Sequence, residues 1–300
     1  MVGAQIAIFV ARCDNGALLG RRIPVLRGGA AVMSQTDARP NLEGRIAVVT
    51  GGASGIGRAI AVLLAECGAR VFVGDYDPVP ENVAASRKLS IVDRRCDVRV
   101  ESDVRDLIEA AVTAGGGLDI LVNNAGIGLV KPIIEVSEEE WSACLDTNLK
   151  GAFLAAKHAI PHLIARGGGS IVNTASNAGI LPRAHDPVYS TSKGALVALT
   201  KCLALCHSPD RIRVNAVCPG PVGDTRMMNA DLDRVPDREA AIGQFIRASP
   251  LARAHGRMIA PQEVAEAVLY LVSDAAQMVT GTLIAIDGGK SLGVPPVGDA

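Results

Sequence analysis

Tyr189 and Lys193 are the two residues whose types and spacing most directly indicate chemistry, because they lie four positions apart in a segment of helical periodicity. Residues four apart share one face of a helix, so the ammonium group is expected one turn from the phenol. Free tyrosine has a pKa of about 10, too high for a base at neutral pH, and a nearby cation lowers it. Such a tyrosine can take a hydroxyl proton or return it, which is general acid–base chemistry.

Ser176 supplies the context that this pair needs, because any helix can carry a tyrosine and a lysine at this spacing. The serine lies thirteen residues before Tyr189, just after a predicted strand that ends at Asn173. In a doubly wound sheet the carboxyl ends of the strands form the ligand crevice, so a serine there could hydrogen-bond the reacting oxygen. The alternative interpretation is an ordinary turn serine.

A glycine-rich turn follows the first predicted strand and reads Thr-Gly-Gly-Ala-Ser-Gly-Ile-Gly over residues 50–57. Glycines let the backbone turn tightly and approach a phosphate, whose charge is favoured by the amino end of the helix that follows. The spacing is G-x-x-x-G-x-G rather than G-x-G-x-x-G, so the turn alone is weak support for a nucleotide site.

Asp75 strengthens the nucleotide interpretation, because it ends the second predicted strand eighteen residues after Gly57. A carboxylate in this position accepts hydrogen bonds from the ribose hydroxyls of a dinucleotide. It would also repel a 2′-phosphate, so we expect NAD as the cofactor. Arg58, near the glycine turn, keeps NADP as the less favoured alternative.

The elements that must position these residues alternate from Arg45 onward, short β-branched runs with longer helical stretches. This alternation is typical of a parallel sheet with helices on both faces. We therefore predict an α/β fold: a single Rossmann-type doubly wound domain with about seven parallel strands. The predicted strands are 46–50, 71–75, 91–96, 120–123, 170–173, 213–217 and 283–286, and the predicted helices are 56–67, 101–114, 137–166, 188–206 and 261–273.

The stretch from about Asn41 to Leu292 resembles a classical short-chain dehydrogenase/reductase. The motifs of that family occur in order: Thr50-Gly51 with Gly55-Ile56-Gly57, Asp97-Val98, Asn123-Asn124-Ala125-Gly126, Asn148, Ser176, Tyr189-x-x-x-Lys193, Pro219-Gly220 and Asp287-Gly288-Gly289. The resemblance implies an NAD(P)-dependent oxidoreductase that transfers a hydride between the nicotinamide cofactor and a small secondary alcohol or ketone.

Roles for individual residues follow from the same resemblance. Tyr189 would be the acid/base, Ser176 would orient the substrate oxygen, and Lys193 would bind the nicotinamide ribose and lower the pKa of the tyrosine. Asn148 would hold a water molecule in a proton relay behind Lys193, and Asp97 would meet the adenine ring. The expected cofactor-binding residues are Gly51, Ser54, Gly55, Ile56, Gly57, Asp75, Asp97, Val98, Asn124, Ala125, Gly126, Tyr189, Lys193, Pro219, Gly220, Val222 and Thr225.

The segment after Gly220 departs from the commoner form of the family, which places the threonine one residue earlier than Thr225. We still expect Val222 and Thr225 to contact the nicotinamide amide and the phosphate. Residues from about 222 to 260 would form a mobile substrate lid. The expected substrate-contacting residues are Ser176, Asn177, His185, Tyr189 and Pro221, although a loop histidine such as His185 is more often simply solvated.

Composition limits the partners of this chain of 300 residues. Its 30 basic and 31 acidic side chains form no long run of either sign, so neither nucleic acid nor a membrane surface is an expected partner. No apolar run approaches the roughly 20 residues of a membrane-spanning helix. The seven scattered cysteines fit reduced thiols in the cytoplasm, and Cys202, Cys206 and His207 lack the further ligands that a metal site needs.

Residues 1–43 are expected to be a disordered N-terminal extension of a dehydrogenase domain that spans residues 44–300. An organellar targeting peptide and a true start at Met33 are the alternatives. The family resemblance implies a homotetramer. Two other functions stay open: a non-catalytic NAD-sensing protein of the same fold, against which the intact Ser176, Tyr189 and Lys193 argue, and a sugar-nucleotide epimerase or dehydratase, for whose larger substrate domain the chain has no room.

Overall fold

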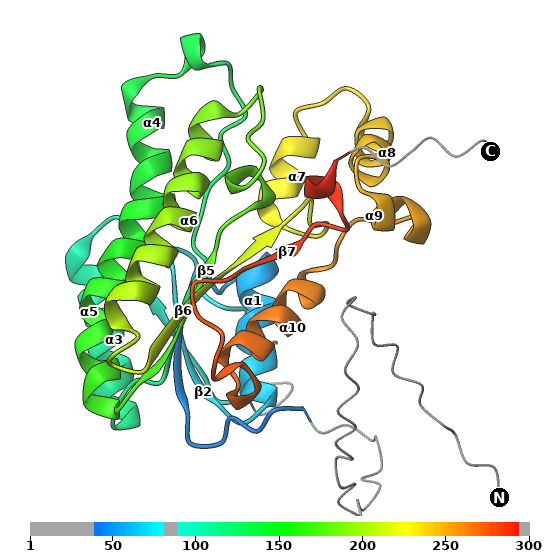
Figure 1. Ribbon diagram of the computed structural model, residues 1–300. Helices are drawn as coiled ribbons and strands as arrows, with labels where there is room; N and C mark the ends of the chain where they lie inside the picture. The colour runs from blue at the N-terminus through cyan, green and yellow to red at the C-terminus, as the bar shows by residue number, and fades with distance from the viewer. Residues whose placement is uncertain (1–38, 81–88, 294–300) are drawn as a thin grey trace, which may run out of the picture. The chain divides into compact units, whose positions relative to one another are not determined.

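A parallel sheet of seven strands forms the centre of the unit from Arg39 to Ala300, of which the computed structural model describes residues 39–80 and 89–293. The strands lie in the order β3-β2-β1-β4-β5-β6-β7 (Figure 1). Their bounds are β1 (Ile46–Thr50), β2 (Arg70–Asp75), β3 (Ile91–Arg95), β4 (Ile120–Asn123), β5 (Gly169–Thr174), β6 (Ile212–Pro219) and β7 (Leu283–Ile286). The strand order reverses between β1 and β4, which is where such sheets bind ligands. The predicted fold class is confirmed.

Helices cover both faces of this sheet. On one face α1 (Gly55–Glu66) packs against α10 (Pro261–Val272), and on the other α3 (Glu101–Gly115) packs against α5 (Gly151–Arg166). A longer helix, α6 (Pro187–His207), lies against β6 and also contacts α4 (Glu138–Leu145). Figure 1 shows α1 and α10 together on the side of the sheet away from α3 and α5.

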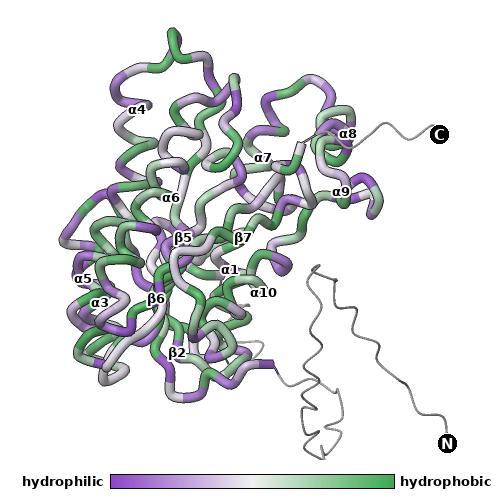
Figure 2. Tube along the Cα trace, in the orientation of Figure 1, coloured by the Kyte–Doolittle hydropathy of each residue, from purple (hydrophilic) through white to green (hydrophobic). Residues whose placement is uncertain are grey.

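Two apolar clusters hold the layers together, one on each face of the sheet. Ala47 and Val49 of β1 face α1 and α10, whereas Ile46 and Val48 face α3 and α5. Successive side chains of a strand point to opposite faces, so a strand covered on both sides must be apolar throughout. In Figure 2 the hydrophobic colour is accordingly frequent along the strands and along α1 and α10.

The predicted helix over 137–166 is interrupted in the structure. Its residues form α4, a π-helical turn η2 (Asp146–Lys150) and α5 in succession. A π turn inserts a residue into the helical repeat and is frequent at functional sites. Asn148 lies on this π turn, so its side chain points in a different direction from the one that a continuous α-helix would give it.

The expected lid region contains three short helices, α7 (Arg226–Leu232), α8 (Arg238–Arg247) and α9 (Pro250–His255).

At the other end of the domain, packing begins before residue 44. Leu42 is buried and its amide donates to the carbonyl of Cys67 at 2.7 Å. Residues 1–38 of the expected extension lie outside the described residues, so its disorder stays a prediction.

Candidate active site

The glycine turn between β1 and α1 takes a backbone path that requires glycine. Gly51 and Gly55 have φ angles of +66° and +52°, a region that other residues rarely adopt. A Cβ atom on Gly57 would overlap the carbonyl oxygen of Gly51. Ser54, the N-cap of α1, makes no side-chain hydrogen bond to the helix, so the first amides, including that of Ile56, stay available to an anion.

The segment after β4 braces this turn. The side-chain amide of Asn124 donates to the carbonyls of Thr50 at 3.2 Å and Gly51 at 2.9 Å. In return, the hydroxyl of Thr50 accepts the backbone amides of Asn124 and Ala125. Asn124 and Ala125, expected from the sequence to line the cofactor, therefore also fix the shape of the glycine turn.

Asp75 joins the glycine turn to the end of β2. One carboxylate oxygen accepts the amide of Ala53 at 2.9 Å, and the other accepts the amide of Asp77 at 3.2 Å. Each oxygen keeps a lone pair free for a further donor. The residue expected to bind ribose thus also holds the turn in position.

Asp97 and Val98, expected at the adenine ring, have partners within the protein. Asp97 accepts three hydrogen bonds from the Arg99 guanidinium, which hold the pKa of its carboxyl below the usual value. Val98 is buried, and the absence of a side chain at Gly151 leaves it room. A contact of Asp97 with adenine stays a prediction.

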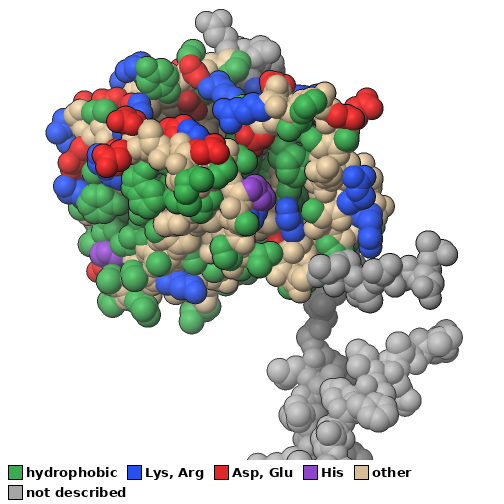
Figure 3. Space-filling view, turned by 90° about the horizontal axis from the view of Figure 1, so that it is seen from above, with side chains coloured by type: hydrophobic (Ala, Val, Ile, Leu, Met, Phe, Trp, Pro, Cys, Tyr) green, Lys and Arg blue, Asp and Glu red, His purple; other side chains and the backbone are tan. Residues whose placement is uncertain are grey.

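Tyr189, Ser176 and Lys193 come together at the carboxyl end of β5. Ser176 lies two residues after the end of the strand, and α6 carries Tyr189 and Lys193 on its first two turns. All three side chains are more than nine-tenths buried. Figure 3 looks down on this end of the molecule, where hydrophobic, basic and histidine side chains surround a recess. The three residues, which are up to seventeen positions apart in the sequence, therefore form one buried cluster.

Burial controls the acidity of the tyrosine. Desolvation raises the pKa of Tyr189 above its ordinary value, while a hydrogen bond with Ser176 and the charge of Arg183 act in the lowering direction. The direction differs from the lowering expected from Lys193, whose Nζ lies 5.9 Å from the centre of the tyrosine ring. The physical reason is that a buried phenolate loses more hydration than these neighbours replace.

Lys193 is itself strongly desolvated. Its Nζ donates to the carbonyl of Thr174 at 2.8 Å, and burial lowers the pKa of Lys193 to about 8. A Cβ atom on Gly126 would lie 3.3 Å from the same Nζ. Glycine at position 126 therefore leaves space beside the ammonium group.

Asn148 lies on the π turn, and both polar atoms of its side chain make hydrogen bonds. Its Oδ1 accepts the amide of Ile127 at 2.8 Å, and its Nδ2 donates to the carbonyl of Ile127 and to the hydroxyl of Ser192. Ser192 in turn donates to the carbonyl of Tyr189 at 2.7 Å. This chain of hydrogen bonds connects Asn148 to α6 through protein groups; the water relay stays a prediction.

The segment after β6 lies beside the glycine turn. Pro219 ends β6, Gly220 donates its amide to Ile286, and Val222 is buried against Ile259. A Cβ atom on Gly55 would lie 3.2 Å from the methyl group of Thr225, so this threonine adjoins the glycine turn. That proximity supports the expected role of Thr225 despite its shifted position.

Among the residues expected to contact substrate, Asn177 is buried and lies 3.5 Å from the hydroxyl of Ser176 through its Oδ1. Pro221 is partly buried, next to Gly220 at the end of β6. His185 is exposed on the loop before α6 and makes no hydrogen bond within the described residues. The exposure agrees with the solvated alternative.

Sequence reasoning missed an ion pair on that loop. Asp186 has no exposed surface and pairs with Arg183, whose guanidinium carbon lies 5.6 Å from the centre of the Tyr189 ring. Ser190 donates to Asp186 at 2.9 Å. The signal that could have revealed the pair is the occurrence of two opposite charges three residues apart in an otherwise uncharged loop just before the tyrosine.

Within residues 39–80 and 89–293, no group of histidine, cysteine, aspartate and glutamate side chains could hold a metal ion. No helix in the same ranges is both long enough and apolar enough to cross a membrane.

Comparison with known proteins places the chain among dehydrogenases. Residues 51–291 match the family described as enoyl-(acyl carrier protein) reductase. The 4-formylbenzenesulfonate dehydrogenase of Comamonas testosteroni is 40% identical over 257 residues, which cover 84% of this chain and 100% of the relative. The cis-4-hydroxycyclohexanecarboxylate dehydrogenase of Sinomonas cyclohexanicum is 40% identical over 253 residues, which cover 82% and 96%.

A solved structure agrees with the same grouping. The ligand-free aldohexose dehydrogenase of Thermoplasma acidophilum superposes with a TM-score of 0.78 at 34% sequence identity, covering 86% of this chain and 98% of that protein.

Proposed function

The chain belongs to the short-chain dehydrogenase/reductase family, whose members are NAD(P)-dependent oxidoreductases, and we propose that it interconverts a small secondary alcohol and its ketone with NAD as the preferred cofactor. The observation that carries this proposal is the convergence of Ser176, Tyr189 and Lys193 at the carboxyl ends of the strands, beside the glycine turn. A sensor without turnover has no need of an acid/base cluster, and the comparisons give that alternative no support.

The residues present fit a dinucleotide. The uncapped amides at the start of α1 suit a pyrophosphate, and the carboxylate of Asp75 suits the ribose hydroxyls that NAD offers. A 2′-phosphate at the same place would meet that negative charge, which is the basis for preferring NAD over NADP. When bound, the nicotinamide accepts a hydride from the alcohol carbon or returns one to the ketone.

The protein groups handle the proton. Ser176 orients the substrate oxygen by a hydrogen bond, and Tyr189 takes the hydroxyl proton during oxidation or gives it back during reduction. Lys193, held by Thr174, stabilises the phenolate form of Tyr189 and binds the nicotinamide ribose. Burial of all three excludes water, which strengthens each of these interactions.

For the substrate we propose an alcohol on a small ring. Asn177 adjoins Ser176, and Pro221 and Met227 follow the carboxyl end of β6; we propose that this small or apolar set contacts the substrate, which would suit a cyclic or aliphatic alcohol. The two relatives described above are named for ring compounds, a benzenesulfonate aldehyde and a hydroxycyclohexanecarboxylate. The cytoplasmic location and the homotetramer stay predictions.

The test is turnover by the full chain with NAD or NADP and a panel of secondary alcohols that includes cyclohexanols, followed by absorbance of the reduced nicotinamide. Tyr189→Phe removes only the transferable proton, so we expect turnover to fall by at least about a thousandfold while the Kd for NAD changes little. Tyr270→Phe, at a half-exposed tyrosine of α10, is the matched control. Substantial activity in Tyr189→Phe would exclude this tyrosine as the acid/base, and tight NAD binding without turnover on any alcohol would favour the sensor.

A further inference from the structure

A cavity of about 470 Å³ lies at the opposite end of the sheet from the candidate active site. Its lining includes Arg45 just before β1, Asp119 just before β4 and Arg213 at the start of β6. Because all these strands are parallel, their amino ends meet at one edge and their carboxyl ends at the other. This amino-end cavity is therefore separate from the crevice that holds Ser176 and Tyr189.

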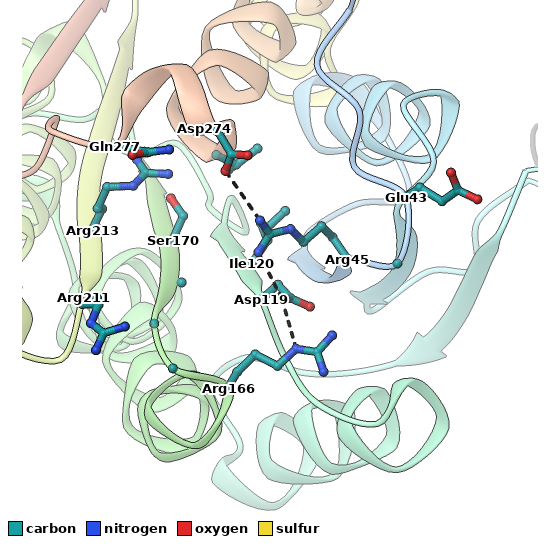
Figure 4. A pocket seen from close by; sticks show the side chains of 15 residues that line it. Glu43, Arg45, Asp119, Ile120, Arg166, Ser170, Arg211, Arg213, Asp274 and Gln277 are labelled. Carbon is teal, nitrogen blue, oxygen red and sulfur yellow. Dashed lines mark hydrogen bonds and ion pairs between the residues drawn. The ribbon is translucent and has the colours of Figure 1, made fainter.

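Four arginines line the amino-end cavity, and they come from different parts of the chain: Arg45, Arg166, Arg211 and Arg213. Figure 4 shows Arg45 and Arg166 on either side of Asp119, with Arg211 and Arg213 across the cavity. The lining also holds the carboxylates of Glu43, Asp119 and Asp274, but Glu43 lies at the edge, directed away from the others. The arginines thus outnumber the carboxylates that face them.

The carboxylates occupy only some of the guanidinium donors. Asp119, which is 4% exposed, accepts Nη1 of Arg45 at 3.3 Å and Nε of Arg166 at 3.2 Å. Asp274 pairs with the remaining Nη2 of Arg45 at 3.5 Å. The two terminal nitrogens of Arg166 keep no partner within the described part of the chain.

Arg211 and Arg213 carry charge that no carboxylate pairs with in the described residues. Arg213 donates to the backbone carbonyls of Leu271 and Ser273, which leaves its positive charge in place. The side chain of Arg211 makes no hydrogen bond or ion pair in the same ranges. Two guanidinium forks, those of Arg166 and Arg211, are therefore open to a ligand.

The backbone at Arg211 is also unusual. Its φ of +57° lies in the left-handed region, where glycine or asparagine is the common residue. Its carbonyl accepts the amide of Gly169 at 3.2 Å, and a Cβ atom on Gly168 would crowd the same carbonyl. The chain thus places a long cation at a position where its conformation costs free energy, which points to a use for the side chain.

We propose that the amino-end cavity binds a small organic polyanion, whose two or more carboxylate or phosphate groups are held by the open forks of Arg166 and Arg211. The planar fork of arginine matches the two oxygens of either group and forms paired, charge-assisted hydrogen bonds. A cavity of 470 Å³ is within the usual range for small-molecule sites and larger than one inorganic anion requires. Gln277, whose amide also lies at this cavity, offers a neutral contact to the rest of the molecule.

The test is isothermal titration calorimetry of the full chain with three probes: citrate, fructose 1,6-bisphosphate and inorganic phosphate. We expect saturable binding of citrate or of the bisphosphate, and at least about tenfold weaker binding of inorganic phosphate, because it engages only one fork. The tighter of the two organic probes identifies the group as carboxylate or phosphate.

Two variants distinguish this cavity from other anion sites. Arg166→Gln combined with Arg211→Asn should weaken binding at least about tenfold, since both open forks are removed and asparagine tolerates the left-handed backbone. Arg105→Gln, at an exposed arginine of α3 paired only with Asp106, should bind like the wild type. If the thermal midpoint shows that the double variant is unfolded, Arg211→Asn alone, which breaks no hydrogen bond, should give the same direction of change. The proposal would be overturned by a lack of saturable binding of every probe, or by wild-type affinity in the folded variants that lack Arg211.

Discussion

The carboxylate of Asp75 combines a negative charge with two backbone contacts, and substitution can separate them. Asp75→Asn keeps an oxygen that can accept the amide of Ala53 but removes the charge that would repel a 2′-phosphate. We expect the ratio of kcat/KM for NAD to that for NADP to fall at least about tenfold. Steady-state rates with both cofactors measure this ratio. Asp77→Asn, at a more exposed carboxylate paired with Arg226, is the control, and an unchanged ratio in Asp75→Asn would assign the preference to another residue.

Arg183 and Asp186 act on Tyr189 in opposite directions. The charge of Arg183 lowers the pKa of the phenol, and that of Asp186 raises it. Arg183→Gln should therefore move the pH profile of kcat/KM for alcohol oxidation to higher pH, whereas Asp186→Asn should move it to lower pH. Rate profiles across pH 6–10 for both variants measure the shifts. Changes in KM without displaced profiles would show that the pair only shapes the loop.

Some residues of the candidate site were predictable from the sequence, and others were not. Ser176, Tyr189 and Lys193 were identifiable because helical spacing puts the tyrosine and the lysine on one face, and Ser176 follows a predicted strand at the end where doubly wound sheets bind ligands. The opposite charges of Arg183 and Asp186 are visible in the sequence, but the burial of their ion pair was not predictable, because it depends on the path of a loop that has no periodicity. The same limit hid the contact of Asp75 with Ala53, which forms only when the glycine turn folds back on β2.

Among the elements, the junction of β1 with α1 leaves the least freedom for substitution. Gly57→Ala would force its Cβ against the carbonyl of Gly51 and displace the first turn of α1. We expect the affinity for NAD to fall at least about tenfold, because the amides that face the pyrophosphate would move. Isothermal titration calorimetry with NAD measures the Kd. Gly243→Ala, within α8 beside the flexible Arg247 side chain, should bind NAD normally; wild-type affinity in Gly57→Ala would contradict the proposed phosphate site.

Element boundaries were predictable where the pattern is strong. The runs 46–50, 120–123 and 283–286 are strands as predicted, because each is an apolar or β-branched run set between turn residues. The helix predicted over 137–166 was not uniform, since a π turn changes the repeat by a single residue and leaves the apolar pattern nearly the same. The three helices of the lid region were missed because they are short and largely exposed, so they lack an apolar stripe.

At the scale of the whole molecule, the parallel sheet separates two chemical environments. Its carboxyl ends gather the glycine turn, Asp75 and the acid/base cluster, while its amino ends gather the arginines around Asp119. The alternation of strands and helices predicted the first environment, because ligand sites of doubly wound sheets lie at the carboxyl ends. It gave no indication of the second, since those arginines are far apart in the sequence and meet only when the sheet forms.

Burial of Lys193 in this core makes the stability of the whole protein depend on pH. The pKa of Lys193 is lowered from 10.5 to about 8 in the folded protein, so between these values the unfolded chain binds more protons than the folded one. The contribution of Lys193 to the free energy of unfolding therefore rises with pH across this window, by up to about 3 kcal/mol, and does not change with pH below pH 8. The raised pKa values of the buried thiols Cys96 and Cys218 have the opposite effect above about pH 9, and that of Tyr189 has it above pH 10, so the contribution of Lys193 is isolated by comparison with a variant that lacks only this lysine.

Lys193→Met should remove that rise, because methionine fills a similar volume and carries no proton. Urea unfolding of the cofactor-free protein at intervals from pH 7.5 to 9.5 measures the difference. The free energy of unfolding of the wild type should increase relative to that of Lys193→Met as pH rises. Lys201→Met, at an exposed lysine of the same helix, should keep the slope of the wild type. Parallel curves for the wild type and Lys193→Met would show that the lysine is already hydrated or paired in the folded protein, so that its burial does not lower its pKa.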